Sequence, residues 1–165
     1  MLLYKLPVYL GILFLMTACG FQPLYVEHNN GTGTQDALSK ISINSIPDRL
    51  GQQVHNFLLD RISPLGKPEL PLYSLNVKIG LSRQDLGVSR DDTATRAKLI
   101  LSANYVLVDR KNGQKLFQGN TQSVNSFTIV NSDFANLSAE NDALSRAARE
   151  VSDSIRLRLA LYFAS

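Results

Sequence analysis

The sequence predicts an α+β domain in which two helices pack on one face of a four-stranded, mostly antiparallel sheet, in the order β-α-β-β-β-α. Two long segments carry apolar residues every three or four positions, a spacing typical of amphipathic helices. Three segments alternate apolar and polar residues, which indicates strands with one buried face. A fourth extended segment follows a strong hairpin signal, so we expect it to pair antiparallel with the strand before it.

The first two elements are predicted within residues 40–62. Residues 40–46 read as a strand because Ile41 and Ile43 fall on one face. A helix then starts at Pro47 or Asp48 and ends before Pro64, since proline cannot continue a helix. The apolar residues of this helix recur at steps of one, three and four positions: Leu50, Val54, Phe57, Leu58 and Ile62.

Two further strands follow, separated by a charged connection. Residues 72–81 resume the alternation, and residues 97–108 continue it with one face apolar throughout. Residues 82–95 are polar and include Gly87, which predicts a hairpin loop. The buried face of these two strands is predicted to hold Leu75, Val77, Ile79, Leu81, Ala97, Leu99, Leu101, Ala103, Tyr105 and Leu107.

The last strand and the last helix complete the domain. The Asn-Gly pair at residues 112–113 predicts a tight turn, because these residues readily adopt the positive φ that such turns require. Residues 114–130 then form an unusually polar strand. Ser138 is predicted to cap a helix of about 25 residues. Its apolar stripe comprises Leu144, Ala148, Val151, Ile155, Leu159 and Tyr162, while Arg146, Arg149, Asp153 and Arg156 face away.

Composition is that of a globular protein preceded by an export signal. Of the 165 residues, 44% are apolar and 19% charged, with a formal net charge of +3. Residues 1–18 combine Lys5, an uncharged apolar stretch and a small-residue end, the pattern of a signal peptide. Their removal leaves 147 residues with a net charge of +2. A chain of this length folds without a metal or disulfide, and its bulk charge gives no indication of nucleic-acid binding.

The single cysteine follows the apolar stretch directly. Residues 14–19 resemble a bacterial lipobox, in which the cysteine is acylated and becomes the new N-terminus, so Cys19 is the predicted lipidation site. Gly20 is not the Asp typical of inner-membrane retention, which implies sorting to the outer membrane. The alternatives are a cleaved secretory signal with an incidental cysteine, or an uncleaved anchor helix. The predicted organisation is a signal peptide (1–18), a lipidated N-terminus with a flexible tether (19–39) and one α+β domain (40–165).

Few residues suggest catalysis or metal binding. His28 falls in the tether and His55 in the first helix, so the two histidines do not share a face at ligand spacing. The adjacent pair Asp91 and Asp92 lies in a charged loop, where solvation is the simpler interpretation. We therefore predict no cofactor, no metal and no enzymatic activity. A lipid-anchored hydrolase, for which His55 is the available base, is a third class of function.

Binding has more support. Basic residues gather on or beside the connections of the sheet, and arginines suit phosphate groups because they donate paired hydrogen bonds. One alternative is that Arg83, Arg90 and Arg96 merely balance nearby Asp residues. The polar fourth strand and the uncovered sheet face suggest a docking surface or a simply solvated one. The basic residues are Arg83, Arg90, Arg96, Lys98, Lys111 and Lys115.

Residues 19–25, Cys-Gly-Phe-Gln-Pro-Leu-Tyr, resemble the "CGF-x-PLY" start of alphaproteobacterial lipopolysaccharide-assembly lipoproteins, the LptE (RlpB-like) family. The order of the downstream elements is also similar to that family. The resemblance implies a non-enzymatic lipoprotein anchored in the inner leaflet of the outer membrane by acyl chains on Cys19. It further implies that the domain sits in or against the β-barrel translocon LptD, supports barrel assembly and helps insert lipopolysaccharide into the outer leaflet.

The same resemblance implies a lipopolysaccharide contact through basic residues near the loop and strand ends of the sheet. Arg90 is the nearest equivalent, and Arg83, Lys111 and Lys115 complete the candidate set. The fourth strand offers Gln118 and Asn120 where a basic residue is expected. The alternative function is an auxiliary lipoprotein of an ABC-type lipid transporter, which would have an inner-membrane permease as its partner.

Overall fold

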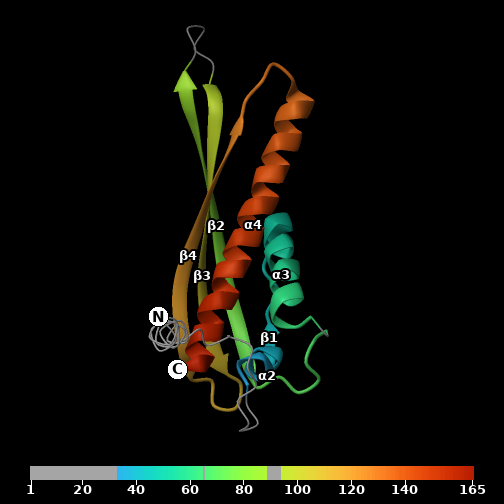
Figure 1. Ribbon diagram of the computed structural model, residues 1–165, viewed down its shortest axis with the longest axis vertical. Coiled ribbons are helices and arrows are strands. Elements are labelled where there is room, and N and C mark those ends of the chain that lie inside the picture. Colours follow the sequence, from blue (N-terminus) through green and yellow to red (C-terminus); the bar gives the residue numbers. More distant parts are fainter. Residues whose placement is uncertain (1–32, 65, 89–93) are drawn as a thin grey trace, which may run out of the picture. The chain divides into compact units, whose positions relative to one another are not determined.

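The computed structural model describes residues 33–64, 66–88 and 94–165. Within these residues the chain forms three helices and one four-stranded sheet, shown in Figure 1. The elements are α2 (Thr34–Ser39), β1 (Ile41–Ile43), α3 (Asp48–Ile62), β2 (Tyr73–Val88), β3 (Ala94–Asp109), β4 (Lys115–Thr128) and α4 (Asp133–Ala164).

The sheet has the order β1-β2-β3-β4. Strand β1 pairs parallel with β2, while β2–β3 and β3–β4 are antiparallel. The helices α3 and α4 lie on the same side of the sheet (Figure 1). The predicted α+β class, with two long helices on one face of a mostly antiparallel sheet, is therefore confirmed.

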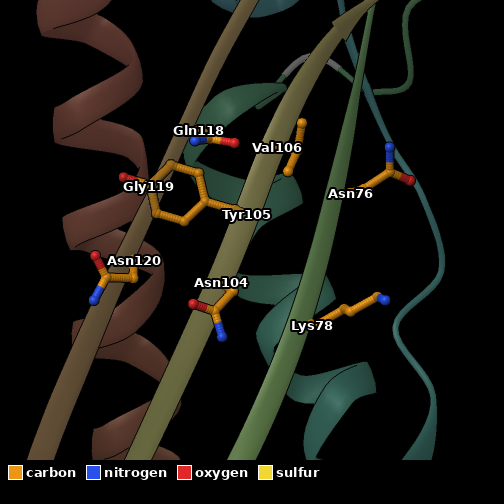
Figure 2. Close-up of a pocket in the computed structure, with 8 residues that line it drawn as sticks. All are labelled: Asn76, Lys78, Asn104, Tyr105, Val106, Gln118, Gly119 and Asn120. Atoms are coloured by element: carbon orange, nitrogen blue, oxygen red, sulfur yellow. The ribbon is translucent and has the colours of Figure 1, made fainter. Parts of the chain in front are cut away.

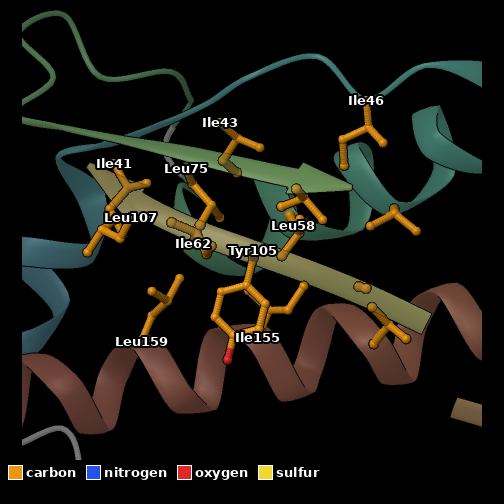
Figure 3. Packing of buried hydrophobic residues seen from close by; sticks show 14 of the residues in the cluster. Ile41, Ile43, Ile46, Leu58, Ile62, Leu75, Tyr105, Leu107, Ile155 and Leu159 are labelled. Carbon is orange, nitrogen blue, oxygen red and sulfur yellow. The ribbon is translucent and has the colours of Figure 1, made fainter. Parts of the chain in front are cut away.

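The core lies between the sheet and the two long helices. Residues of one parity on β2 and β3 face inward, as shown by the cross-strand pair Leu75 and Leu107, both fully buried. Figure 3 shows these side chains in one buried cluster with Leu58 of α3 and Ile155 of α4. The predicted apolar face of β3 is fully confirmed by the burial of Ala97, Leu99, Leu101, Ala103, Tyr105 and Leu107.

The predicted tether ends earlier than expected. Residues 34–39 form helix α2 rather than coil, and Leu38 in this helix is only 1% exposed because it packs into the main core. The Lys40 ammonium also pairs with the Asp36 carboxylate at 2.5 Å. The signal peptide and residues 19–32 of the tether, Cys19 included, lie outside the described residues.

The predicted loop at residues 82–95 is wrong at both ends. Strand β2 continues to Val88 and β3 begins at Ala94, with Arg83 opposite Leu99 and Asp85 opposite Ala97. In this part the β2–β3 hairpin extends beyond the end of α3 (Figure 1), so β2 is not buried on either face. Leu81 is accordingly 48% exposed. The apolar alternation fades although the strand continues.

The cap of the last helix lies six residues before the predicted one. Ser132, and not Ser138, is the N-cap, and its side-chain oxygen accepts a hydrogen bond from the Ala135 amide at 3.4 Å. The first turns carry Phe134, which is 83% exposed, and Leu137. Because these apolar residues do not continue the buried stripe, the periodicity begins only further along the helix.

Candidate binding surface

Arg83 is held in a cluster of contacts within the domain. Its guanidinium donates to the Asp85 carboxylate at 2.9 Å and to the Glu140 carboxylate of α4 at 2.8 Å. It also lies 5.5 Å from the ring centroid of Phe127. The hydrogen bond to Asp85, with the charge of Glu140, raises the pKa of Arg83. The interpretation that Arg83 balances Asp85 is therefore confirmed, and the same cluster ties β2 to α4.

Lys111 and Lys115 lie at the other end of the sheet. Lys111 is exposed in the turn between β3 and β4, where its amide donates to the Asp109 carboxylate at 2.7 Å. Lys115 is the exposed first residue of β4 and is opposite Val108. Arg83 is opposite Leu99, so about 30 Å of strand separates it from Lys115. These two ends do not form one compact site, and Arg90 lies outside the described residues.

The polar residues of β4 divide between its two faces. On the covered face, hydroxyl and amide groups bond to α4: Thr121 donates to Ser154 at 2.9 Å, and Ser123 donates to Glu150 at 2.5 Å. Asn125 continues this contact by donating to Ser123 at 2.8 Å. Three of the polar side chains that suggested a docking strand therefore bind the last helix to the sheet.

The remaining polar side chains of β4 face away from the helices. We call this side of β2, β3 and β4 the open face. The register places the side chains of Lys78, Asn104 and Asn120 in one row across the three strands. Figure 2 shows these three side chains on adjacent strands. They lie beside an open depression of about 480 Å³. The depression is lined by Asn76, Lys78, Asn104, Tyr105, Val106, Gln118, Gly119 and Asn120.

A glycine fixes the position of β4 behind this depression. The ring of Tyr105 lies across β4 at Gly119 (Figure 2), and a Cβ atom at that position would be 2.5 Å from the tyrosine oxygen. Tyr105 is 1% exposed, and burial raises its pKa while Arg158 acts in the opposite direction. Because strand side chains alternate between faces, this pairing directs Gln118 and Asn120 outward.

The described residues contain no group of three His, Cys, Asp or Glu side chains that could hold a metal ion. His55 lies in α3 and is half-buried, as expected for a helix residue facing partly inward. His28, Asp91 and Asp92 lie outside the described residues. In the part of the chain that the structure describes, every helix is too short or too polar to cross a membrane.

Solved structures share this fold. A protein described as a lipoprotein of Caulobacter crescentus CB15 is 27% identical, with a TM-score of 0.66 over 81% of this chain and 97% of that one. The rare lipoprotein B of Shewanella oneidensis has 13% identity and a TM-score of 0.56, covering 73% of this chain and 92% of its own. A minor lipoprotein of Acinetobacter baumannii has 17% identity and a TM-score of 0.55, covering 73% and 90%. At such low identity the last two show the fold alone.

No curated protein matches this chain significantly. The family model for LptE, described as lipopolysaccharide assembly, matches residues 37–159. This match covers the α+β domain and not the motif at residues 19–25 on which the resemblance rested, so the two observations are independent. The chain belongs to the LptE family of lipopolysaccharide-assembly lipoproteins.

Proposed function

We propose that this chain is the lipoprotein subunit of the lipopolysaccharide translocon of the outer membrane. In this role it supports assembly of an LptD-type β-barrel, plugs the barrel and aids insertion of lipopolysaccharide into the outer leaflet. The observation that carries the proposal is membership of the lipopolysaccharide-assembly family over residues 37–159. Acyl chains on Cys19 would anchor the chain in the inner leaflet of the outer membrane, since several acyl chains anchor stably where one does not.

The geometry supports a plug role through its exposed polar surface. The interior of an outer-membrane barrel is polar, so a domain inside it needs hydrogen-bonding side chains on its outside. The open face supplies them on three adjacent strands without a helix in front of them. The proposed work is noncovalent, because it consists of anchoring, docking and positioning.

The role is tested by depleting the protein from its cell. We expect the barrel to accumulate in a misassembled form and lipopolysaccharide at the cell surface to fall. Barrel maturation would be followed by its mobility in unheated gels, and surface lipopolysaccharide by labelling of intact cells. A fully assembled barrel with normal surface lipopolysaccharide in depleted cells would refute the proposal.

Direct lipopolysaccharide contact is proposed at Arg90, Lys111 and Lys115. Lys111 and Lys115 are exposed at the β3–β4 turn, and Arg90 belongs to the connection between β2 and β3. Arg83 is less suited, because its guanidinium is already bound by two carboxylates.

The test combines Arg90→Glu with Lys115→Glu in the purified mature protein. We expect binding to lipopolysaccharide to weaken several-fold, because anion affinity depends on the local positive charge. Arg49→Glu with Lys67→Glu, at exposed positions of α3 and of the connection before β2, is the control for the same change in net charge. Unchanged affinity of the double variant would refute direct contact at these residues and leave the barrel role intact.

A further inference from the structure

The open face carries no carboxylate among the described residues. Each described Asp or Glu lies on a helix, in a connection or on the covered side of the sheet. These acids are Asp36, Asp48, Asp60, Glu69, Asp85, Asp109, Asp133, Glu140, Asp142, Glu150 and Asp153. A solvated surface normally carries both acidic and basic side chains, so a whole face without acids differs from an ordinary solvated surface.

The charges that the open face does carry are positive. Lys78 lies in β2, and Arg96 and Lys98 lie in β3. Among the described residues, none of these three cations forms an ion pair. Arg61 and Arg83, away from this face, are both paired with carboxylates of the same domain. The open face therefore keeps its positive charge available to a partner.

Lys78 lies too far from Arg96 and Lys98 for the three cations to hold one small anion. Lys98 is opposite Gln84, which follows Lys78 by six positions in β2, so the rows of the two lysines are roughly 20 Å apart. A single phosphate or carboxylate group is bound by cations within hydrogen-bond distance of it. The spacing instead suits an extended partner whose anionic groups are distributed over a surface.

Between the cations the open face consists mainly of amide and hydroxyl groups. They include Asn104 and Ser102 of β3 and Gln118, Asn120 and Gln122 of β4. With strands of 14 to 16 residues, three strands present roughly 700 Å². This area is close to the roughly 800 Å² that each partner contributes to a specific protein interface. Amide side chains both donate and accept, so they complement polar side chains on another protein.

We propose that the open face is the docking surface for a polar protein wall that bears carboxylates. This inference rests on the proposed function, under which that wall is the inside of the β-barrel. The barrel side chains that face β2, β3 and β4 then include Asp or Glu opposite Lys78 and Lys98. The helical side of the domain, where acids and bases already pair with one another, then faces the lumen of the barrel and not this wall.

Site-specific photocrosslinking in cells tests which face meets the barrel. A photoreactive residue at Asn104, exposed on the open face, is compared with one at Asn56, exposed on α3. We expect Asn104 to crosslink to the barrel polypeptide and Asn56 not to do so. A crosslink from Asn104 to lipopolysaccharide, or barrel crosslinks from Asn56 alone, would overturn the inference. Failure of the unmodified chain to co-purify with any barrel would refute the proposed function as well.

Charge reversal tests the chemistry of the contact. The double variant Lys78→Glu with Lys98→Glu is compared with Arg49→Glu with Lys67→Glu, which changes the net charge equally on exposed positions outside the open face. Circular dichroism first establishes that both variants fold. We expect at least about tenfold less barrel to co-purify with the open-face variant than with the unmodified protein, because the interface depends on charge. The control variant should co-purify with as much barrel as the unmodified protein does. Equal retention by both variants would overturn the inference.

Discussion

Replacing Gly119 by alanine tests the contact that sets the register of β4. The added Cβ would lie 2.5 Å from the Tyr105 oxygen and 2.7 Å from its Cζ atom. Nonbonded carbon atoms ordinarily lie about 3.5–4.0 Å apart. The Tyr105 ring is 1% exposed and packs against Phe117, with 6.1 Å between ring centroids, so it has little room to move.

Overpacking of this kind costs about 1–3 kcal/mol, while replacing a strand glycine by alanine returns roughly 0.5–1 kcal/mol of backbone entropy. We therefore expect Gly119→Ala to lower the free energy of unfolding by about 1–2 kcal/mol. In urea denaturation of the purified protein, followed by circular dichroism, the midpoint should fall by roughly 0.5–1 M.

Gly80→Ala is the matched control. Gly80 lies in β2 on the open face, and a Cβ there meets only the Ser102 oxygen at 3.1 Å. We expect its stability to be unchanged or raised by up to about 1 kcal/mol. Adding Tyr105→Phe to Gly119→Ala should restore only part of the loss, because the contact with the ring carbon remains. Equal midpoints for Gly119→Ala and Gly80→Ala would refute the reasoning.

Three further predictions concern stability. Ser132→Ala should lower the free energy of unfolding by about 0.5–1 kcal/mol, because the helix cap is lost, whereas Ser138→Ala should not. Equal effects of the two substitutions in thermal unfolding would contradict the assigned start of α4. Burial raises the pKa of Tyr105, so above about pH 10 the unfolded chain loses the tyrosine proton first and the stability of the fold falls. The Tyr105→Phe variant should therefore lose less stability than the unmodified protein between about pH 9 and pH 11 in urea denaturation. An identical loss in the two proteins would be inconsistent with the raised pKa. Arg83→Gln breaks exposed ion pairs and should lower the free energy of unfolding by less than about 1 kcal/mol. Amide hydrogen exchange should become faster only at the outer ends of β2 and β3. Faster exchange throughout the sheet would contradict this local role.

The sequence predicts the elements best where one face of an element is buried. The apolar sides of α3 and β3 were identified because burial imposes a clear period on Val54, Leu58, Leu101 and Leu107. Beyond Leu81 both faces of β2 are exposed, so the sequence shows no strand period there and predicts a loop. The outer end of β2 is held by its backbone pairing with β3 and by the contacts of Arg83 with α4 and Phe127, which no apolar period reveals.

The start of α4 was missed for a related reason. The exposed Phe134 and Leu137 lie outside the buried stripe, so the helical period begins only after them. Helix α2 is too short to show a period, and its burial depends on Leu38 alone. Ser132 three residues before Ala135 was the available cap signal, but serines are frequent in this region and do not distinguish one start from another.

The candidate surface could be predicted only in part. The polarity of β4 was visible in the sequence, but its division between a helix contact and the open face depends on the register with β3. That the described residues of the open face include no carboxylate likewise becomes visible only when the three strands are aligned. The sequence does not reveal the ion pair between Arg83 and Glu140, because the two residues lie 57 positions apart.

The central claim is that this lipopolysaccharide-assembly protein works as the partner of an outer-membrane barrel. Affinity purification of the tagged, lipidated chain from isolated outer membranes, followed by mass spectrometry, measures this directly. We predict that an LptD-type barrel is the main co-purifying polypeptide and that it is lost when Lys78 and Lys98 are both changed to glutamate. Recovery of an inner-membrane permease instead, or of no barrel, would contradict the account.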